Sequence, residues 1–107
     1  MYTGKEKTSI SREVANNTIG EALQSRHMDF TSTYLSRDAT QELLAIPNAV
    51  GLRLYTAKIE EEGKPYKTLV AVAVDADGND LLQGDEAVLC DLPCPRHCPD
   101  DGDTVWP

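Results

Sequence analysis

The sequence predicts a small α+β domain in which two N-terminal helices pack on a small antiparallel sheet. Three observations lead to this fold class. Residues 69–74 form an unbroken apolar run of strand length, and residues 50–59 alternate between apolar and polar side chains. Residues 12–26 and 37–45 repeat apolar side chains at helical spacing. Because the helices precede the strands instead of alternating with them, the order is typical of an α+β domain.

The apolar run predicts the central strand of the sheet. Successive side chains of a strand point to opposite faces, so the β-branched residues share one face and the smaller residues share the other. The first set is Val70, Val72 and Val74, and the second is Leu69, Ala71 and Ala73. Neither set can be left in water, so we expect cover on both faces.

Capping residues predict where the two helices begin and end. Ser11 is the expected N-cap of the helix at 12–26, and Ser36 is the expected N-cap of the second helix. Pro47 cannot follow a helical residue easily, so the second helix should end near Ala45.

Turn-forming residues divide the second half of the chain. A charged loop at 60–65 should join the strand at 50–59 to the strand at 66–75 as a hairpin. The acids and glycine of residues 75–80 predict the next turn. A third, short strand is expected between residues 81 and 89.

The chain has the length of one domain with a tail at either end. We expect residues 1–8 to be a flexible N-terminus and residues 9–89 to form the single α+β domain. Residues 90–107 are rich in Cys, Pro and Asp, which predicts an irregular acidic tail.

Charge and hydropathy restrict the partners. The net charge is −8, and residues 59–107 hold three basic against twelve acidic side chains. This acidic half repels phosphate, so we expect no nucleic-acid partner. The apolar runs are too short to cross a bilayer, so we expect no membrane partner. Without an apolar signal segment near the start, the expected location is cytoplasmic.

Four potential zinc ligands fall within nine residues: Cys90, Cys94, His97 and Cys98. Zinc binds four such side chains at tetrahedral corners, and the spacing permits this. A disulfide between two of the three cysteines is an alternative, as is a set of reduced thiols in a tail that packs on the domain. We favour the reduced thiols and expect no cofactor, with zinc as the alternative.

Catalytic and calcium motifs are missing. The chain contains no G-x-S-x-G, P-loop, dinucleotide fingerprint or C-x-x-C, and neither His27 nor His97 has a recognisable nucleophile beside it. The acids at 75–80 do not fit a calcium loop, because Ala73 and Gly84 occupy its first and twelfth positions. We therefore name no catalytic residue. Arg53 could bind an anion, but pairing with an acid of a neighbouring strand is the commoner outcome.

Several segments carry a resemblance that covers most of the chain. They are I-S-R-E at 10–13, S-R-D at 36–38, V-G-L-R-L-Y at 50–55, T-L-V-A-V-A-V-D-A-D-G-N-D at 68–80 and C-P-x-x-C at 94–98. In this order they are similar to a set of small uncharacterised bacterial proteins. The resemblance implies a common fold and no particular activity.

These observations favour a non-enzymatic protein-binding or accessory module that presents its acidic tail or a sheet edge to another protein. Self-association is also expected, since a two-stranded sheet needs further cover. A zinc-binding or thiol-redox protein is the alternative, and an enzyme with an unrecognised acid-dependent site ranks last.

Overall fold

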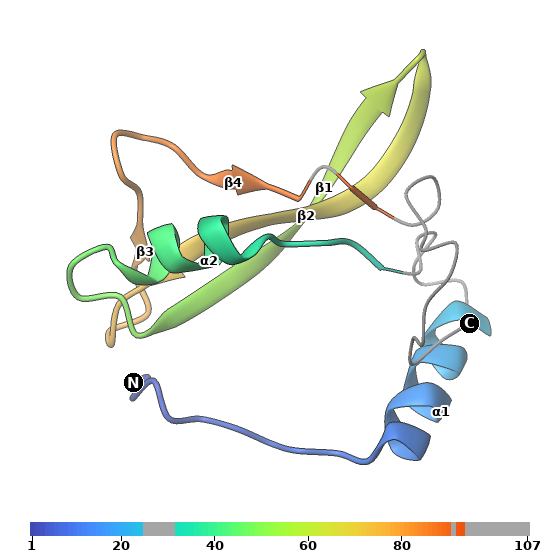
Figure 1. Ribbon diagram of the computed structural model, residues 1–107, viewed down its shortest axis with the longest axis horizontal. Coiled ribbons are helices and arrows are strands. Elements are labelled where there is room, and N and C mark those ends of the chain that lie inside the picture. The colour runs from blue at the N-terminus through green and yellow to red at the C-terminus, as the bar shows by residue number, and fades with distance from the viewer. Residues whose placement is uncertain (25–31, 91, 94–107) are drawn as a thin grey trace.

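A computed structural model describes residues 1–24, 32–90 and 92–93 of the chain. Its helices and strands follow the order α1 (Arg12–Gln24), α2 (Arg37–Leu44), β1 (Gly51–Glu61), β2 (Lys64–Val74), β3 (Asp80–Leu81) and β4 (Val88–Leu89). The four strands form one antiparallel sheet around β2 (Figure 1). This arrangement confirms the α+β class.

The β1–β2 hairpin is longer and its turn is tighter than the sequence predicts. The two strands pair without interruption from Gly51 opposite Val74 to Glu61 opposite Lys64. The predicted loop at 60–65 is therefore wrong, because only Glu62 and Gly63 remain outside the strands. Their φ angles of 53° and 78° are those of a type I′ turn. Its twist matches that of the strands, so both continue to the turn.

The predicted third strand occurs as two short pieces on the other edge of β2. Leu81 of β3 lies opposite Ala73, and Leu89 of β4 lies opposite Val70. A turn closed by the Glu86 amide, which donates to the Gln83 carbonyl at 3.1 Å, lies between the pieces.

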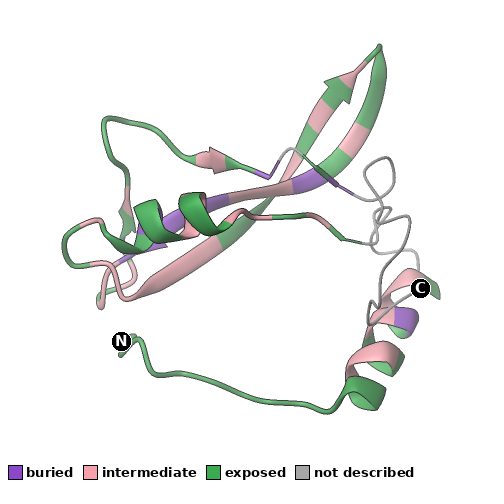
Figure 2. Cartoon of the chain, in the orientation of Figure 1, coloured by how far each residue is buried: buried purple, intermediate pink, exposed green. Residues whose placement is uncertain are grey.

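The core lies between β2 and α2. Ala71 and Ala73 are fully buried, and Leu43 of α2 packs against them. The partly buried residues around this centre are Leu35, Ile46, Ala49, Leu52, Leu81 and Val88. Because alanine carries only a Cβ, the helix can approach the strand closely. Figure 2 shows the buried residues concentrated along β2.

The helix boundaries follow the predicted caps. The Val14 amide donates to Ser11 Oγ at 3.1 Å, and the Ala39 amide donates to Ser36 Oγ at the same distance. Both predicted N-caps are confirmed. Of the two helices, α2 lies against the sheet, whereas α1 lies apart from it in Figure 1, so the predicted packing of helices on the sheet is confirmed for α2 only. The predicted end of the first helix, at residue 26, lies outside the described residues.

Candidate functional site

An arginine, an aspartate and a tyrosine meet on one face of the sheet. Arg53 Nη1 donates to Asp80 Oδ1 at 2.6 Å and to the Gly78 carbonyl at 3.0 Å. The Tyr55 hydroxyl donates to the other carboxylate oxygen of Asp80. Arg53 and Tyr55 are two positions apart on β1, so they share a face, and Asp80 reaches them across β2. Arg53 therefore has the acid partner that the sequence favours for it.

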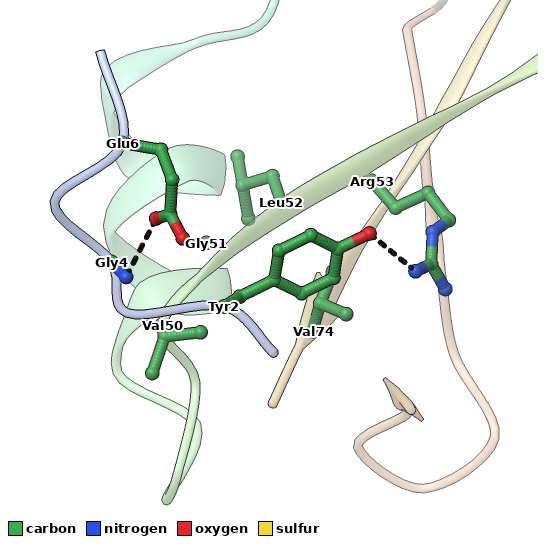
Figure 3. Close-up of a pocket in the computed structure, with 8 residues that line it drawn as sticks. All are labelled: Tyr2, Gly4, Glu6, Val50, Gly51, Leu52, Arg53 and Val74. Carbon is green, nitrogen blue, oxygen red and sulfur yellow. Dashed lines mark hydrogen bonds between the residues drawn. The ribbon is translucent and has the colours of Figure 1, made fainter. Parts of the chain in front are cut away.

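The N-terminal segment contacts this network. The Tyr2 amide donates to the Ala76 carbonyl at 2.8 Å. The hydroxyl oxygen of Tyr2 lies 3.5 Å from Arg53 Nη2 (Figure 3). The predicted flexibility of residues 1–8 stays a prediction, but these contacts oppose it.

Glu6 and Gly4 shape the chain after Tyr2. The Glu6 carboxylate accepts from the Thr3 amide at 2.7 Å and from the Gly4 amide at 2.9 Å. The hydrogen bond from Thr3 is the main reason why the pKa of Glu6 is lowered. Gly4 has a φ of 85°, and a Cβ there would lie 3.0 Å from the Val50 carbonyl oxygen. Only glycine fits this position without strain.

A cleft of about 520 Å³ lies between the N-terminal segment and the sheet. Figure 3 shows its lining residues, which are Tyr2, Gly4, Glu6, Val50, Gly51, Leu52, Arg53 and Val74. Its two charged side chains, Glu6 and Arg53, are both held by partners within the chain. These contacts join the N-terminal segment to the sheet, and no nucleophile with an adjacent base lines this cleft.

Removing the carboxylate at the centre of the network should loosen the attachment of β3 to β1. We expect Asp80→Ala to lower the thermal midpoint by about 2–5 °C, since Arg53 and Tyr55 both lose their acceptor. In an Arg53→Ala background the same change should have a smaller effect, because only the hydrogen bond from Tyr55 then remains to be lost. Circular dichroism melts of the four combinations measure this. Equal effects in both backgrounds would show that Arg53 and Asp80 are independent.

The acidic stretch at 75–80 is a turn, as predicted. Asp75 Oδ1 accepts from the Asp77 amide at 3.0 Å and from the Asn79 amide at 2.9 Å. These bonds, that from the Asn79 amide above all, lower the pKa of Asp75. Gly78 has a φ of 89°, which supplies the left-handed residue of the turn.

The lowered pKa of Asp75 predicts a pH-dependent contribution to stability. Since the folded state favours the carboxylate, its stabilisation is present above the ordinary pKa of 3.8 and is lost as the pH falls through the lower folded value. Asp75→Ala should reduce the urea midpoint at neutral pH, and the difference from wild type should shrink below about pH 4. Asp77→Ala is the control, with little effect at either pH. A difference for Asp75→Ala that is the same at all pH values would contradict this account.

Only one of the four predicted zinc ligands lies in the described part of the chain. Cys90 is buried, and its amide donates to the Leu69 carbonyl at 2.9 Å. Cys94, His97 and Cys98 lie outside the described residues. Within residues 1–24, 32–90 and 92–93, no three His, Cys, Asp or Glu side chains are grouped closely enough to hold a metal ion.

The burial of Cys90 predicts a protected thiol. In a Cys94→Ser/Cys98→Ser variant, we expect the remaining thiol to react with a disulfide reagent at least about tenfold more slowly in the native state than in urea. Equal rates would show that the thiol is accessible.

Elemental analysis of wild-type protein purified without chelator tests the zinc prediction, for which about one zinc per chain is needed.

The described helices include none that is both long and apolar enough to cross a membrane. Comparison of the chain with protein-family models, curated proteins and solved structures found no match.

Sequence reasoning missed the N-terminal half of this site. Tyr2 and Glu6 lie in a polar segment without periodicity, and their position depends on residues far along the chain. For Asp80 the sequence predicts a place in a turn and no partner. The alternation around Arg53 and Tyr55 was the one usable signal, because it places both side chains on the same face of a strand.

Proposed function

We propose that this chain is a non-enzymatic protein-binding or accessory module and that its docking surface is the free edge of β1. One observation carries the proposal. β1 is 11 residues long, and within residues 1–24, 32–90 and 92–93 only one of its edges is paired, to β2. No other strand that the structure describes pairs with its outer edge. A long unpaired edge is a template for an added strand.

The hairpin turn fixes which backbone groups face outward. In a two-residue hairpin the pair next to the turn, Glu61 and Lys64, exchanges hydrogen bonds between the strands. Bonding then alternates along β1, so its odd-numbered residues point their amides and carbonyls to β2. The residues of β1 whose backbone amides and carbonyls point away from β2 are Leu52, Leu54, Thr56, Lys58 and Glu60. These groups can form a ladder with an extended segment of a partner protein.

Side chains beside this edge add apolar surface. Leu54 and Tyr55 are 54% and 44% exposed, and they stand on opposite faces of β1. Tyr55 leans over β2, where its hydroxyl donates to Asp80. An added strand would therefore cover part of Leu54, which favours binding through burial of apolar area. By contrast, the two charged side chains of the cleft, Glu6 and Arg53, already form hydrogen bonds with other groups of the same chain.

A proline at the middle of the edge tests the proposal. Thr56→Pro removes one outward-facing amide and no bond to β2, whereas Thr56→Val keeps the amide. Peptides selected from a random display library on wild-type protein should bind Thr56→Val as well as wild type and should bind Thr56→Pro at least about tenfold more weakly. When a selected peptide binds, the amide chemical shifts that change should be those of β1. Selected peptides that bind all three proteins equally would refute the β1 edge as the docking surface.

A further inference from the structure

We infer that the cleft between the N-terminal segment and the sheet binds a small zwitterion, with the carboxylate of the ligand at Arg53 and its ammonium group at Glu6. The ligand class is a molecule that carries these two groups at the ends of an apolar chain. This site is separate from the outer edge of β1 and goes beyond the proposed function. Three features support it: the lining of the cleft, the positions of its two charges, and the way in which each charged group is held.

The cleft has the size and the lining of a small-molecule site. Its volume of about 520 Å³ lies within the range of roughly 300–1,000 Å³ that is usual for ligand pockets. Val50, Leu52 and Val74 give it apolar walls on the side of the sheet, and Tyr2 lines the side formed by the N-terminal segment. An apolar chain of several carbon atoms would leave water on entering it, which favours binding.

The two charges of the cleft have opposite signs and lie at opposite ends. Figure 3 shows Glu6 and Arg53 on either side of the Tyr2 ring. Glu6 is ionised at neutral pH, since the hydrogen bond from the Thr3 amide lowers its pKa, and arginine keeps its charge. A ligand with a single charge is attracted to one end and repelled by the other. A ligand with both charges is attracted at both ends.

Arg53 has donors left for a carboxylate. Its Nη1 uses two N–H groups on the Asp80 carboxylate and the Gly78 carbonyl, which fix the guanidinium group in place. Nη2 carries two more N–H groups, and its contact with the Tyr2 hydroxyl oxygen is long for a hydrogen bond, at 3.5 Å. A carboxylate is a stronger acceptor than a phenol oxygen, so it can take that place. The Arg53 side chain is 32% exposed, so a ligand can reach it.

Glu6 has acceptor capacity left for an ammonium group. Each of its carboxylate oxygens accepts one backbone amide, Oε2 from Thr3 and Oε1 from Gly4. A carboxylate oxygen has two lone pairs, so each can accept one further hydrogen bond. Because these amides hold the side chain in position, it loses little conformational freedom when a ligand binds. Both charged groups are therefore positioned by the chain itself before a ligand arrives.

Probes that carry one or both charges test the site. The ω-amino acids from aminobutyrate to aminooctanoate are titrated into the full chain, and the tightest is compared with the fatty acid and the alkylamine of the same length. We expect the ω-amino acid to bind at least about tenfold more tightly than either compound with one charge. The amide chemical shifts that change should be those of Val50, Gly51 and Leu52. Equal affinity for the three compounds, or changes confined to other residues, would overturn the inference.

Two variants test which end of the ligand each residue holds. Glu6→Gln should weaken binding of the ω-amino acid and the alkylamine at least about tenfold without weakening the fatty acid. Arg53→Lys keeps a positive charge beside Asp80 but lacks Nη2, so it should weaken the ω-amino acid and the fatty acid without weakening the alkylamine. A variant that only loosened the cleft would weaken both singly charged compounds, and that result would overturn the roles given to these residues. A wild-type chain that binds none of the compounds at millimolar concentration would overturn the site itself, whatever peptides do at the edge of β1.

Discussion

Replacing Leu43 with alanine is expected to lower the free energy of unfolding by about 2–4 kcal/mol. Leu43 is only 5% exposed, and it is the residue through which α2 packs on the fully buried Ala71 and Ala73. The two alanines have no side-chain atoms that could move into the space left by the leucine, so a cavity would remain. Urea unfolding followed by circular dichroism measures the loss.

The next residue of the same helix is a matched control. Leu44 is 48% exposed, so Leu44→Ala makes the same chemical change outside the core. Its expected effect is within about 0.5 kcal/mol. If the two substitutions cost the same, α2 would not pack on β2 through Leu43, and the core would have to lie elsewhere.

Replacing Thr68 with valine is expected to cost about 1–2 kcal/mol. Thr68 is fully buried, and its hydroxyl donates to the Cys90 carbonyl. The hydroxyl oxygen of Thr33 lies 3.0 Å from that of Thr68 and also donates to Cys90 at 3.3 Å. Valine has nearly the same shape, so the loss reports the buried hydrogen bonds and not a cavity.

Thr56→Val controls for the exchange of a hydroxyl for a methyl group in the same hairpin. Thr56 is exposed, so its replacement should change the urea midpoint little. A Thr68→Val protein as stable as wild type would mean that the buried hydroxyl makes no net contribution. In that case the hydrogen bonds from the Cys90 amide to the Leu69 carbonyl and from the Thr33 hydroxyl to the Cys90 carbonyl would be enough to hold the chain at Cys90.

Local features of the fold were predictable because their causes lie within a few residues. The N-caps at Ser11 and Ser36 and the turn built on Asp75 each depend on side chains bonding to amides two to four positions away. The alternation in β1 and β2 assigned residues to faces correctly for the same reason, since it follows from the period of a strand.

The same sequence reasoning failed where distant segments determine the outcome. Residues 60–65 read as a loop because they are charged, yet pairing with the opposite strand extends the hairpin to a two-residue turn. The short third strand was expected, but its division between β3 and β4 depends on which parts of residues 80–89 meet β2. Charge and turn propensity carry no information about such pairing.

By itself, the sequence determined the α+β class, the two helix starts and the two faces of the central strand. The cleft and the network around Arg53 were decided by tertiary structure alone, because Asp80 is 27 positions from Arg53 and Tyr2 is 51 positions away. The free edge of β1 belongs to the same category: whether a strand is central or at an edge depends on the neighbours that the fold supplies, and its own residues do not encode that choice.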